Sequence, residues 1–193
     1  MSELISLKKG LRKILTQKRD LIKKNSKLEF NLEEFNKLSK YINFDEISYV
    51  ASFISIRSEI STGQLNERII ELKKTLLLPV IKKDSQELIF KKYHSNKTLK
   101  PGKFNIPEPI NESESITPQL FFVPCLGFDL SGYRLGYGGG FYDKTFAKYE
   151  KLNLKFYSIG YAFDDQKQSQ IPKEEFDYKL DFVLTEKQLY TFL

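Results

Sequence analysis

The sequence LFFVPCLGFDLSGYRLGYGGGFYDKTFAKYEK, residues 120–151, decides the fold. It begins with a short apolar run that is typical of a buried strand, and it ends with Phe141–Lys151, a segment that favours a helix. A second apolar run follows at residues 156–160. Together they predict a strand, a loop, a helix and another strand, which is the unit from which parallel sheets are built.

Three more helices are predicted before this unit. Thr62 is expected to cap one that runs to Lys74, and Asn31 to cap another, with Glu34 completing its capping box. That helix has a predicted buried stripe of Leu32, Phe35, Leu38 and Ile42. Residues 3–24 form the first helix, whose apolar face consists of Leu4, Leu7, Leu11, Ile14 or Leu15, and Leu21 or Ile22, with cations between them.

Further strands are predicted at residues 47–55, 76–81, 87–93 and 182–184. Because strands alternate with helices, the sequence predicts one α/β domain over residues 1–193, with a mostly parallel sheet covered on both faces. Ligands of such sheets bind beyond the carboxyl ends of the strands. The loops after Ser55, Val123 and Gly160 are therefore the candidate site.

The connection at residues 94–119 contains several prolines and is expected to be irregular. Long connections of this kind are often lids over a functional site. Phe104 within it is a candidate to stack on a flat ring of a ligand.

The composition excludes several classes of protein. Cys125 and His94 are the only residues of their kinds, so neither a disulfide framework, nor a four-ligand zinc site, nor serine–histidine hydrolysis is expected. No apolar run reaches the roughly 18 residues of a membrane helix, and no signal-peptide pattern is present, so we expect a cytoplasmic protein without membrane contact. We also expect a monomer. The net charge of +6 favours nucleotides, phosphorylated or carboxylated metabolites, or nucleic acid as partners.

Residues 136–140 hold four glycines, the most unusual feature of the sequence. Glycines let consecutive N–H groups converge on phosphate oxygens, the next helix adds a favourable dipole, and Arg134 supplies a cation. A Walker A motif is excluded because Asp143, not glycine, precedes Lys144. A dinucleotide fingerprint is excluded because Phe141 stands where glycine or alanine is required. A glycine-rich turn without a ligand stays open as the alternative.

The motif RLGYGGGFYDK at residues 134–144, preceded by FVPCLGFD at residues 122–129, resembles the signature of the 5-formyltetrahydrofolate cyclo-ligase family, also called methenyltetrahydrofolate synthetases. Other segments resemble the family in the same order along the chain. They are KKGLR at residues 8–12, FISIRSEI at residues 53–60, FNIPEP at residues 104–109 and DFVLT at residues 181–185.

The resemblance implies a three-layer α/β/α sandwich. It also implies conversion of 5-formyltetrahydrofolate, with or without a polyglutamate tail, to 5,10-methenyltetrahydrofolate with ATP and Mg²⁺, by phosphorylation of the formyl oxygen and ring closure by N10. Arg134 is the implied catalytic residue. The implied ATP-binding residues are Lys8, Lys9, Gly10, Leu11, Arg12, Arg134, Leu135, Gly136, Tyr137, Gly138, Gly139, Gly140, Phe141 and Tyr142.

The folate and metal ligands are also implied by the resemblance alone. Asp143 and Asp181 are the implied magnesium ligands. Without the resemblance, Asp143 would be interpreted as a carboxylate in the first turn of a helix, and Asp181 as a carboxylate at the edge of a strand. The implied folate contacts are Ile54 and Glu59, together with Tyr137, Gly138, Gly139, Gly140 and Phe141.

Two positions depart from the family pattern. The family usually has glycine where Cys125 stands, and often an acidic residue where Gln119 stands. Neither position contacts phosphate or magnesium in the family pattern, so activity is expected to be retained. Two alternatives of other classes remain: a non-enzymatic nucleic-acid-binding module, and a related α/β enzyme of the phosphosugar-isomerase or acyl-carrier-transferase type.

Overall fold

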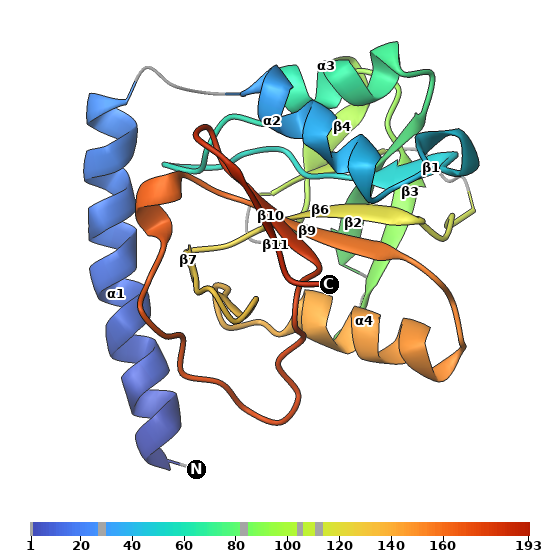
Figure 1. Ribbon diagram of the computed structural model, residues 1–193. Coiled ribbons are helices and arrows are strands. Elements are labelled where there is room, and N and C mark those ends of the chain that lie inside the picture. The colour runs from blue at the N-terminus through green and yellow to red at the C-terminus, as the bar shows by residue number, and fades with distance from the viewer. Residues whose placement is uncertain (1, 27–29, 82–84, 104–105, 111–113) are drawn as a thin grey trace.

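The computed structural model describes residues 2–26, 30–81, 85–103, 106–110 and 114–193. A seven-stranded sheet forms the centre of this described part, in the order β11-β10-β9-β6-β1-β2-β3 (Figure 1). Its strands are β1 (Tyr49–Ala51), β2 (Thr75–Ile81), β3 (Leu88–Lys92), β6 (Leu120–Pro124), β9 (Tyr157–Tyr161), β10 (Phe182–Leu184) and β11 (Leu189–Thr191).

The helices are mostly short, apart from the first. The α-helices are α1 (Ser2–Asn25), α2 (Leu32–Asn36), α3 (Gly63–Glu71) and α4 (Phe141–Lys151). Single turns of 3-10 helix lie at Lys37–Lys40, Phe44–Glu46, Asn96–Thr98 and Asp164–Gln166.

The sheet is mostly parallel, as predicted. Strands β2, β1, β6, β9 and β10 run parallel to their neighbours, and only the edge strands β3 and β11 pair antiparallel. Two small antiparallel pairs lie outside it: β4 (Leu99–Pro101) with β5 (Pro107–Pro109), and β7 (Gly127–Phe128) with β8 (Arg134–Leu135).

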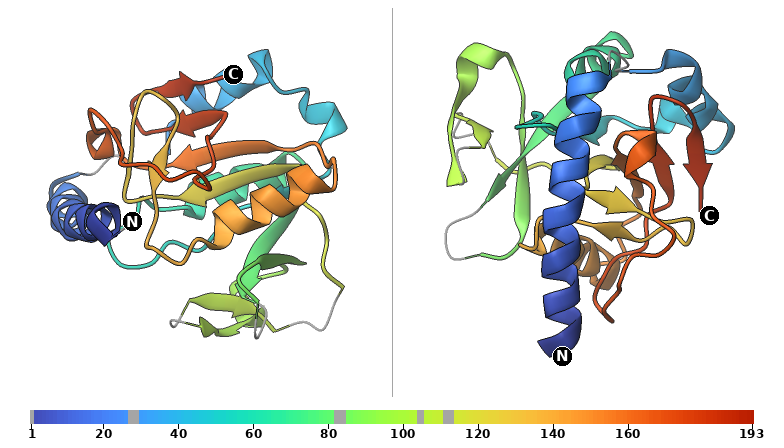
Figure 2. Two further views of the ribbon diagram at one scale, coloured as in Figure 1. Left: turned by 90° about the horizontal axis from the view of Figure 1, so that it is seen from below. Right: turned by 90° about the vertical axis from the view of Figure 1, so that its left-hand side faces the viewer.

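Alternate residues of β6 face opposite sides of the sheet, because side chains of a strand alternate with a period of two. Phe122 packs with residues of α2 and α3, including Phe35 and Leu65, whereas Phe121 packs with Phe146 of α4. Helices therefore cover both faces, which confirms the three-layer α/β/α sandwich (Figure 2).

The chain leaves β1 through α3 towards β2, and it leaves β6 through α4 towards β9, on the other side of the sheet. The neighbouring strands β1 and β6 thus form a point where the strand order reverses, and their carboxyl-end loops diverge to leave a crevice. These loops are residues 52–62 and 125–140. They are the two loops that carry most of the candidate site residues.

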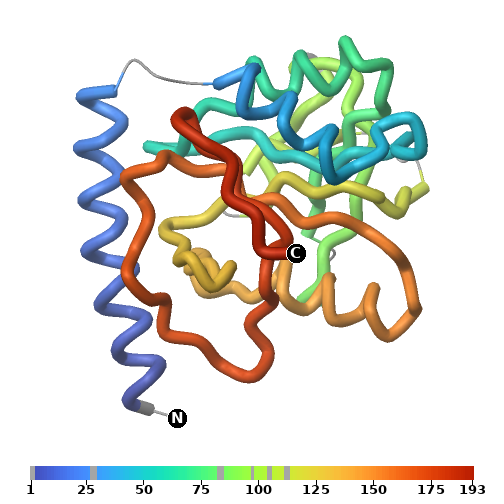
Figure 3. The backbone as a smooth tube through the Cα atoms, in the orientation of Figure 1, coloured from blue at the N-terminus to red at the C-terminus, as the bar shows by residue number. Residues whose placement is uncertain are grey.

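Helix α1 runs along the side of the molecule rather than over a face of the sheet (Figures 2 and 3). Its Leu15 is buried with Leu126, Leu135 and Ile171, which belong to the loops at the carboxyl ends of the strands. Hydrophobic burial therefore fixes α1 across the end of the sheet where the crevice opens.

Several predictions of local structure are wrong in detail. Leu7 of α1 is 56% exposed and Leu32 of α2 is 46% exposed, so neither belongs to a buried stripe. Asn31 does cap α2, but the Glu34 carboxylate accepts from the Leu189 N–H and from Lys37 and forms no capping box with Asn31. Thr62 stands at the start of α3, but its side chain is bonded to Ser55 and does not cap the helix.

The predicted strand at residues 47–55 is only Tyr49–Ala51, because the chain turns into the crevice loop after it. The connection at residues 94–119 is not wholly irregular, since it contains the β4–β5 pair. Phe104 lies outside the described residues, so its expected role stays a prediction.

Candidate active site

The glycine loop, residues 136–140, has the backbone freedom that its composition predicts. Gly138 has φ +102° and Gly140 has φ +65°, values that side-chain-bearing residues rarely adopt. Gly140 begins α4, and no described side chain caps this helix. A Cβ at Gly136 would meet no atom within 4 Å in the described part of the chain. The loop therefore presents open backbone in front of a helix N-terminus, as an anion site requires.

Arg12 of α1 holds this loop in place. Its Nε donates a hydrogen bond to the Gly136 carbonyl at 2.9 Å, and its guanidinium lies 3.2 Å from where a Cβ of Gly138 would stand. The structure thus brings the basic segment of α1 and the glycine loop together, as the resemblance implied.

Arg134 lies on β8 beneath the same loop, with 8% of its surface exposed. Its Nη2 is 3.0 Å from Oδ1 of Asp143, at the start of α4. Its guanidinium also stands over the rings of Tyr142 and Phe146. Its buried Nη1 has no hydrogen-bond partner among the described residues. A buried guanidinium with a free donor is a strong site for an anion, because a charged donor left unpaired in the interior is costly.

The two aspartates assigned to magnesium have different partners. Asp143 forms an ion pair with Arg134 and accepts from the Tyr178 N–H, whereas Asp181 accepts from the N–H and the hydroxyl of Ser158. No hydrogen bond joins the two in the described residues, and no three acidic, histidine or cysteine side chains gather there. Asp181 precedes β10, at the amino ends of the parallel strands, while the glycine loop follows the carboxyl end of β6.

Glu59 and Tyr137 meet across the crevice. The Tyr137 hydroxyl donates to Oε1 of Glu59 at 2.5 Å, and the other carboxylate oxygen accepts from the Ile56 N–H. Burial raises the pKa of Glu59 above its ordinary value, although the hydrogen bonds from Tyr137 and Ile56 and the charge of Arg19 act in the other direction. Two residues that the resemblance assigned to folate are therefore in direct contact.

Lys8 is buried but does not contact the glycine loop. Its ammonium lies 2.8 Å from Glu174 and 2.5 Å from Asp177, in the segment between β9 and β10. Burial alone would lower the pKa of Lys8, but the hydrogen bonds and charges of Asp177 and Glu174 raise it above the ordinary value. The cation that the resemblance assigned to ATP is thus held by two carboxylates.

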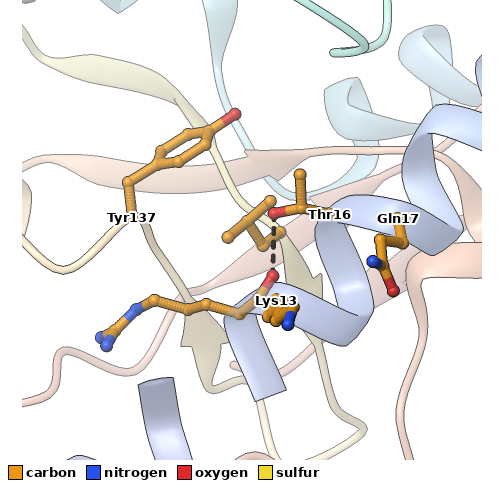
Figure 4. A pocket seen from close by; sticks show the side chains of 6 residues that line it. Lys13, Thr16, Gln17 and Tyr137 are labelled. Carbon is orange, nitrogen blue, oxygen red and sulfur yellow. Dashed lines mark hydrogen bonds between the residues drawn. The ribbon is translucent and has the colours of Figure 1, made fainter. Parts of the chain in front are cut away.

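Two open pockets border these residues. One, of about 320 Å³, lies between α1 and the glycine loop and is lined by Arg12, Lys13, Thr16, Gln17, Leu126 and Tyr137 (Figure 4). The other, of about 450 Å³, lies between the loop after β1 and the β4–β5 pair, and it places Ile54 against Asn96, Leu99, Lys100, Pro101 and Pro107.

The remaining assigned residues are less directly placed. Lys9 and Gly10 are exposed, on the side of α1 away from Lys8. Leu11 and Leu135 pack in the apolar cluster around Leu15. The ring of Phe141 stands against Gly139 and carries Lys103 over its face, so it lies at the rim of the loop.

The model of the 5-formyltetrahydrofolate cyclo-ligase family matches residues 5–186. The chain belongs to this family. It is 34% identical over 146 residues to the 5-formyltetrahydrofolate cyclo-ligase of Escherichia coli K12, covering 73% of this chain and 79% of that one. It is 28% identical over 194 residues to the mouse 5-formyltetrahydrofolate cyclo-ligase, covering 94% of each chain.

A solved structure agrees with the family assignment. The NMR structure of the Aquifex aeolicus 5,10-methenyltetrahydrofolate synthetase matches with a TM-score of 0.72 at 28% identity, over 96% of this chain and 93% of that one. Members of the cyclo-ligase family are enzymes. Membership therefore selects an enzyme of this family over the isomerase-like reaction and over a purely nucleic-acid-binding module.

The two departures from the cyclo-ligase pattern have structural roles. The Gln119 side-chain oxygen accepts from the N–H groups of Ser48 and Tyr49, and its nitrogen donates to the Glu46 carbonyl, which fixes the start of β1. Cys125 is buried, and burial raises the pKa of its thiol to about 12. In the described part of the chain, no helix is long and apolar enough to cross a membrane.

Sequence reasoning missed Arg19. This residue of α1 is 1% exposed and contacts Ser58, Tyr137 and Glu59. The available signal was its spacing: Lys8, Arg12 and Arg19 share one face of a helix, and that is the face which also buries Leu15.

Proposed function

We propose that this chain converts 5-formyltetrahydrofolate to 5,10-methenyltetrahydrofolate, with ATP and Mg²⁺ as requirements and ADP and phosphate as products. Family membership supports the folate reaction. The single observation that best supports nucleotide use is the buried Arg134, whose Nη1 lacks a partner among the described residues directly beneath an open glycine loop.

The residues around this loop fit the phosphates of a nucleotide. Backbone N–H groups at the start of α4 and the glycine loop supply neutral donors, and Arg134 and Arg12 supply charge from β8 and α1. Phosphoryl transfer depends mainly on alignment of the reactants and neutralisation of charge, so these N–H groups and arginines suffice and no histidine is required.

The reaction needs a phosphoryl donor for a chemical reason. A formamide carbonyl is a poor electrophile and its oxygen a poor leaving group, so attack by N10 stalls. Transfer of the terminal phosphoryl group to the formyl oxygen makes that oxygen a leaving group. N10 then forms a bond to the formyl carbon and gives up its proton to solvent, the carbon–oxygen bond breaks, and phosphate leaves with the oxygen. The position of Arg134 beside Asp143 at the glycine loop supports a role in holding the transferred group, where negative charge must be stabilised.

The folate is assigned to the neighbouring loop. Glu59 accepts hydrogen bonds, so its carboxylate suits the N–H groups of a reduced pterin, and Ile54 lines the adjoining pocket. Because β1 and β6 are neighbours, their loops set the two substrates side by side at the reversal point of the sheet.

Magnesium is best supported at Asp143. A magnesium ion is usually held by one or two carboxylates together with substrate phosphates. Asp143 lies beside Arg134 at the glycine loop, where the phosphates are proposed to bind. Asp181 has no such support from its position, because its carboxylate is bonded to Ser158 at the other end of the strands.

The test is turnover of 5-formyltetrahydrofolate with Mg²⁺, in the presence and absence of ATP, followed by the near-ultraviolet absorbance of the methenyl product. We expect growth of this absorbance only with ATP. Arg134→Ala is expected to lose about a hundredfold or more in kcat while keeping the circular dichroism of the wild type. Equal turnover without ATP, or an unaffected Arg134→Ala variant, would contradict the proposal.

A further inference from the structure

Arg19 reaches three parts of the structure from the buried side of α1. Its Nε donates to the Ser58 hydroxyl at 3.1 Å, and its Nη1 donates to the Tyr137 hydroxyl at 2.5 Å. Nη1 also lies 3.8 Å from Oε1 of Glu59. Its guanidinium stands over the Tyr137 ring, 5.4 Å from the centroid. Arg19 thus joins α1 to the loop after β1 and to the glycine loop.

The hydrogen bonding of Arg19 is incomplete. Its Nη2 is buried and has no hydrogen-bond partner in the described ranges of the chain. The Glu59 carboxylate beside it does not supply that partner: it accepts from Tyr137 and Ile56, and its contact with Arg19 is to Nη1 at 3.8 Å, beyond hydrogen-bond distance. A purely structural arginine gains nothing from a buried donor left unpaired, since that donor carries the full desolvation cost. A ligand that brings an acceptor would remove this cost.

The Tyr137 hydroxyl shows what kind of group fits between Arg19 and Glu59. It donates to the carboxylate and accepts from the guanidinium at the same time. A group that fits here therefore carries a donor and an acceptor side by side. Tyr137 is 42% exposed and follows Gly136, so it lies at the open side of this pair, in a glycine-rich segment.

A 4-oxopterin has such an edge. Its 4-oxo oxygen accepts, and the adjacent N3–H and 2-amino group donate. A carboxylate suits the two donors, and a guanidinium suits the oxo group. Arg19 and Glu59 offer these two partners from adjacent positions on one wall of the crevice.

We propose that Arg19 is a substrate-recognition residue: with Glu59 it binds the 4-oxo edge of the reduced pterin, which takes the place of the Tyr137 hydroxyl between them. This inference rests on the proposed function, because it concerns the folate of that reaction. It adds a specificity-determining residue on α1, a part of the chain that the resemblance assigned only to ATP.

The first arm of the test compares Arg19→Met and Arg19→Lys with wild type in steady-state assays. Loss of a charged hydrogen bond is expected to raise the KM for 5-formyltetrahydrofolate about tenfold or more in Arg19→Met, with the KM for ATP unchanged. Arg19→Lys is expected to recover part of the loss, because it keeps the charge. Lys18→Met is the matched control: it removes a cation from the exposed side of the same helix, and should keep the wild-type KM.

The second arm probes the oxo group directly. Folic acid and its 4-amino analogue differ at that position, where the amino group replaces an acceptor by a donor. We expect wild type to be inhibited at least about tenfold more strongly by the 4-oxo compound, and this ratio to fall in Arg19→Met.

The outcomes separate the two proposals. Wild-type protein without ATP-dependent turnover contradicts the proposed function. An active wild type with no preference for the 4-oxo compound, an unchanged KM in Arg19→Met, or the same KM rise in Lys18→Met overturns the role of Arg19 alone. The unfolding temperatures of all variants are measured together with that of wild type. If Arg19→Met does not fold, the KM for 5-formyltetrahydrofolate of Arg19→Lys is compared with wild type instead.

Discussion

The ammonium of Lys8 and the carboxylate of Glu174 lie 2.8 Å apart, joining the first turns of α1 to the segment before β10. Asp177 completes the contact at 2.5 Å. A cation that is assigned to ATP phosphates thus already has two anionic partners inside the protein. Nucleotide binding through Lys8 must compete with these carboxylates, and this competition makes the assignment testable in two directions.

Lys8→Ala is expected to raise the KM for ATP about tenfold, whereas Glu174→Gln is expected to lower it by about threefold, because it removes one competitor for the ammonium. Asp165→Asn is the control, since Asp165 pairs with the exposed Lys187. The measurement is initial rate against ATP concentration at saturating folate. A KM for ATP that is unchanged in both Lys8→Ala and Glu174→Gln would show that Lys8 forms only a structural ion pair and does not bind ATP.

The two assigned metal ligands should separate by titration with magnesium. Asp143→Asn is expected to raise the Mg²⁺ concentration for half-maximal rate about tenfold, because Asp143 lies at the proposed phosphate site. Asp181→Asn should leave that concentration within about twofold and mainly lower stability, since its carboxylate bonds Ser158. An equal rise in both variants would show that the two carboxylates act together, although they have different partners in the structure.

Gly136 offers a test of the open loop. A Cβ there meets no described atom within 4 Å, so Gly136→Ala should fold with an unchanged unfolding temperature. The added methyl group occupies the space in front of the loop, so the KM for ATP should rise about fivefold or more. Gly10→Ala is the comparison variant: the resemblance assigned this position to ATP as well, and it is equally open but lies on the exposed side of α1.

For this pair, a decrease in the unfolding temperature of Gly136→Ala would mean that the loop needs glycine for its backbone alone. A rise in the KM for ATP in Gly10→Ala would instead place the nucleotide on the outer side of α1.

The elements with the clearest patterns were predictable from the sequence. Helix α4 and strand β10 have the predicted bounds, and β6 and β9 each differ by one residue from prediction. The patterns of β6 and β10 are clear because these buried strands are apolar runs, and that of α4 because the glycines before it end the preceding irregular segment.

The orientation of α1 was not predictable in full. Its apolar residues form two stripes, and the stripe of Leu7, Ile14 and Leu21 remains exposed while Leu15 is buried. Periodicity alone cannot rank the stripes, because the choice depends on the loops that α1 covers. The same limit hid Arg19, whose role follows from Glu59 and Tyr137, both distant in sequence. The strands of the pairs β4–β5 and β7–β8 are too short to show the alternation of apolar and polar residues that predicts a strand.

Cys125 is expected to be unreactive in the folded protein. Burial raises its pKa to about 12, so at pH 8 almost no thiolate is present, and the thiolate is the nucleophile. Alkylation by iodoacetamide, followed by mass spectrometry, should be slower than in urea by about two orders of magnitude or more. Rapid alkylation of folded protein with retained activity would show that the segment after β6 opens freely.

Glu59 should make folate use sensitive to acid. Burial is the main cause that raises its pKa above 4.5, while Tyr137, Ile56 and the cations Arg19 and Arg57 act against that rise. As pH falls through this raised pKa, the carboxylate gains a proton and loses its capacity to accept from the pterin N–H groups. We expect kcat/KM for 5-formyltetrahydrofolate, at saturating ATP, to fall at a higher pH than for an ordinary glutamate.

Glu59→Gln separates this effect from the titration of the substrates. The amide keeps one acceptor and cannot titrate, so kcat/KM should be about tenfold or more lower near neutrality and lose the acid limb that Glu59 causes. The KM for ATP serves as the internal control, because Glu59 lies in the loop of residues 52–62, which is proposed to bind folate and not ATP. An acid limb at the same pH in Glu59→Gln and wild type would assign that titration to another group. The Glu59 carboxylate would then help to shape the crevice, but its titration would not cause the pH dependence of kcat/KM.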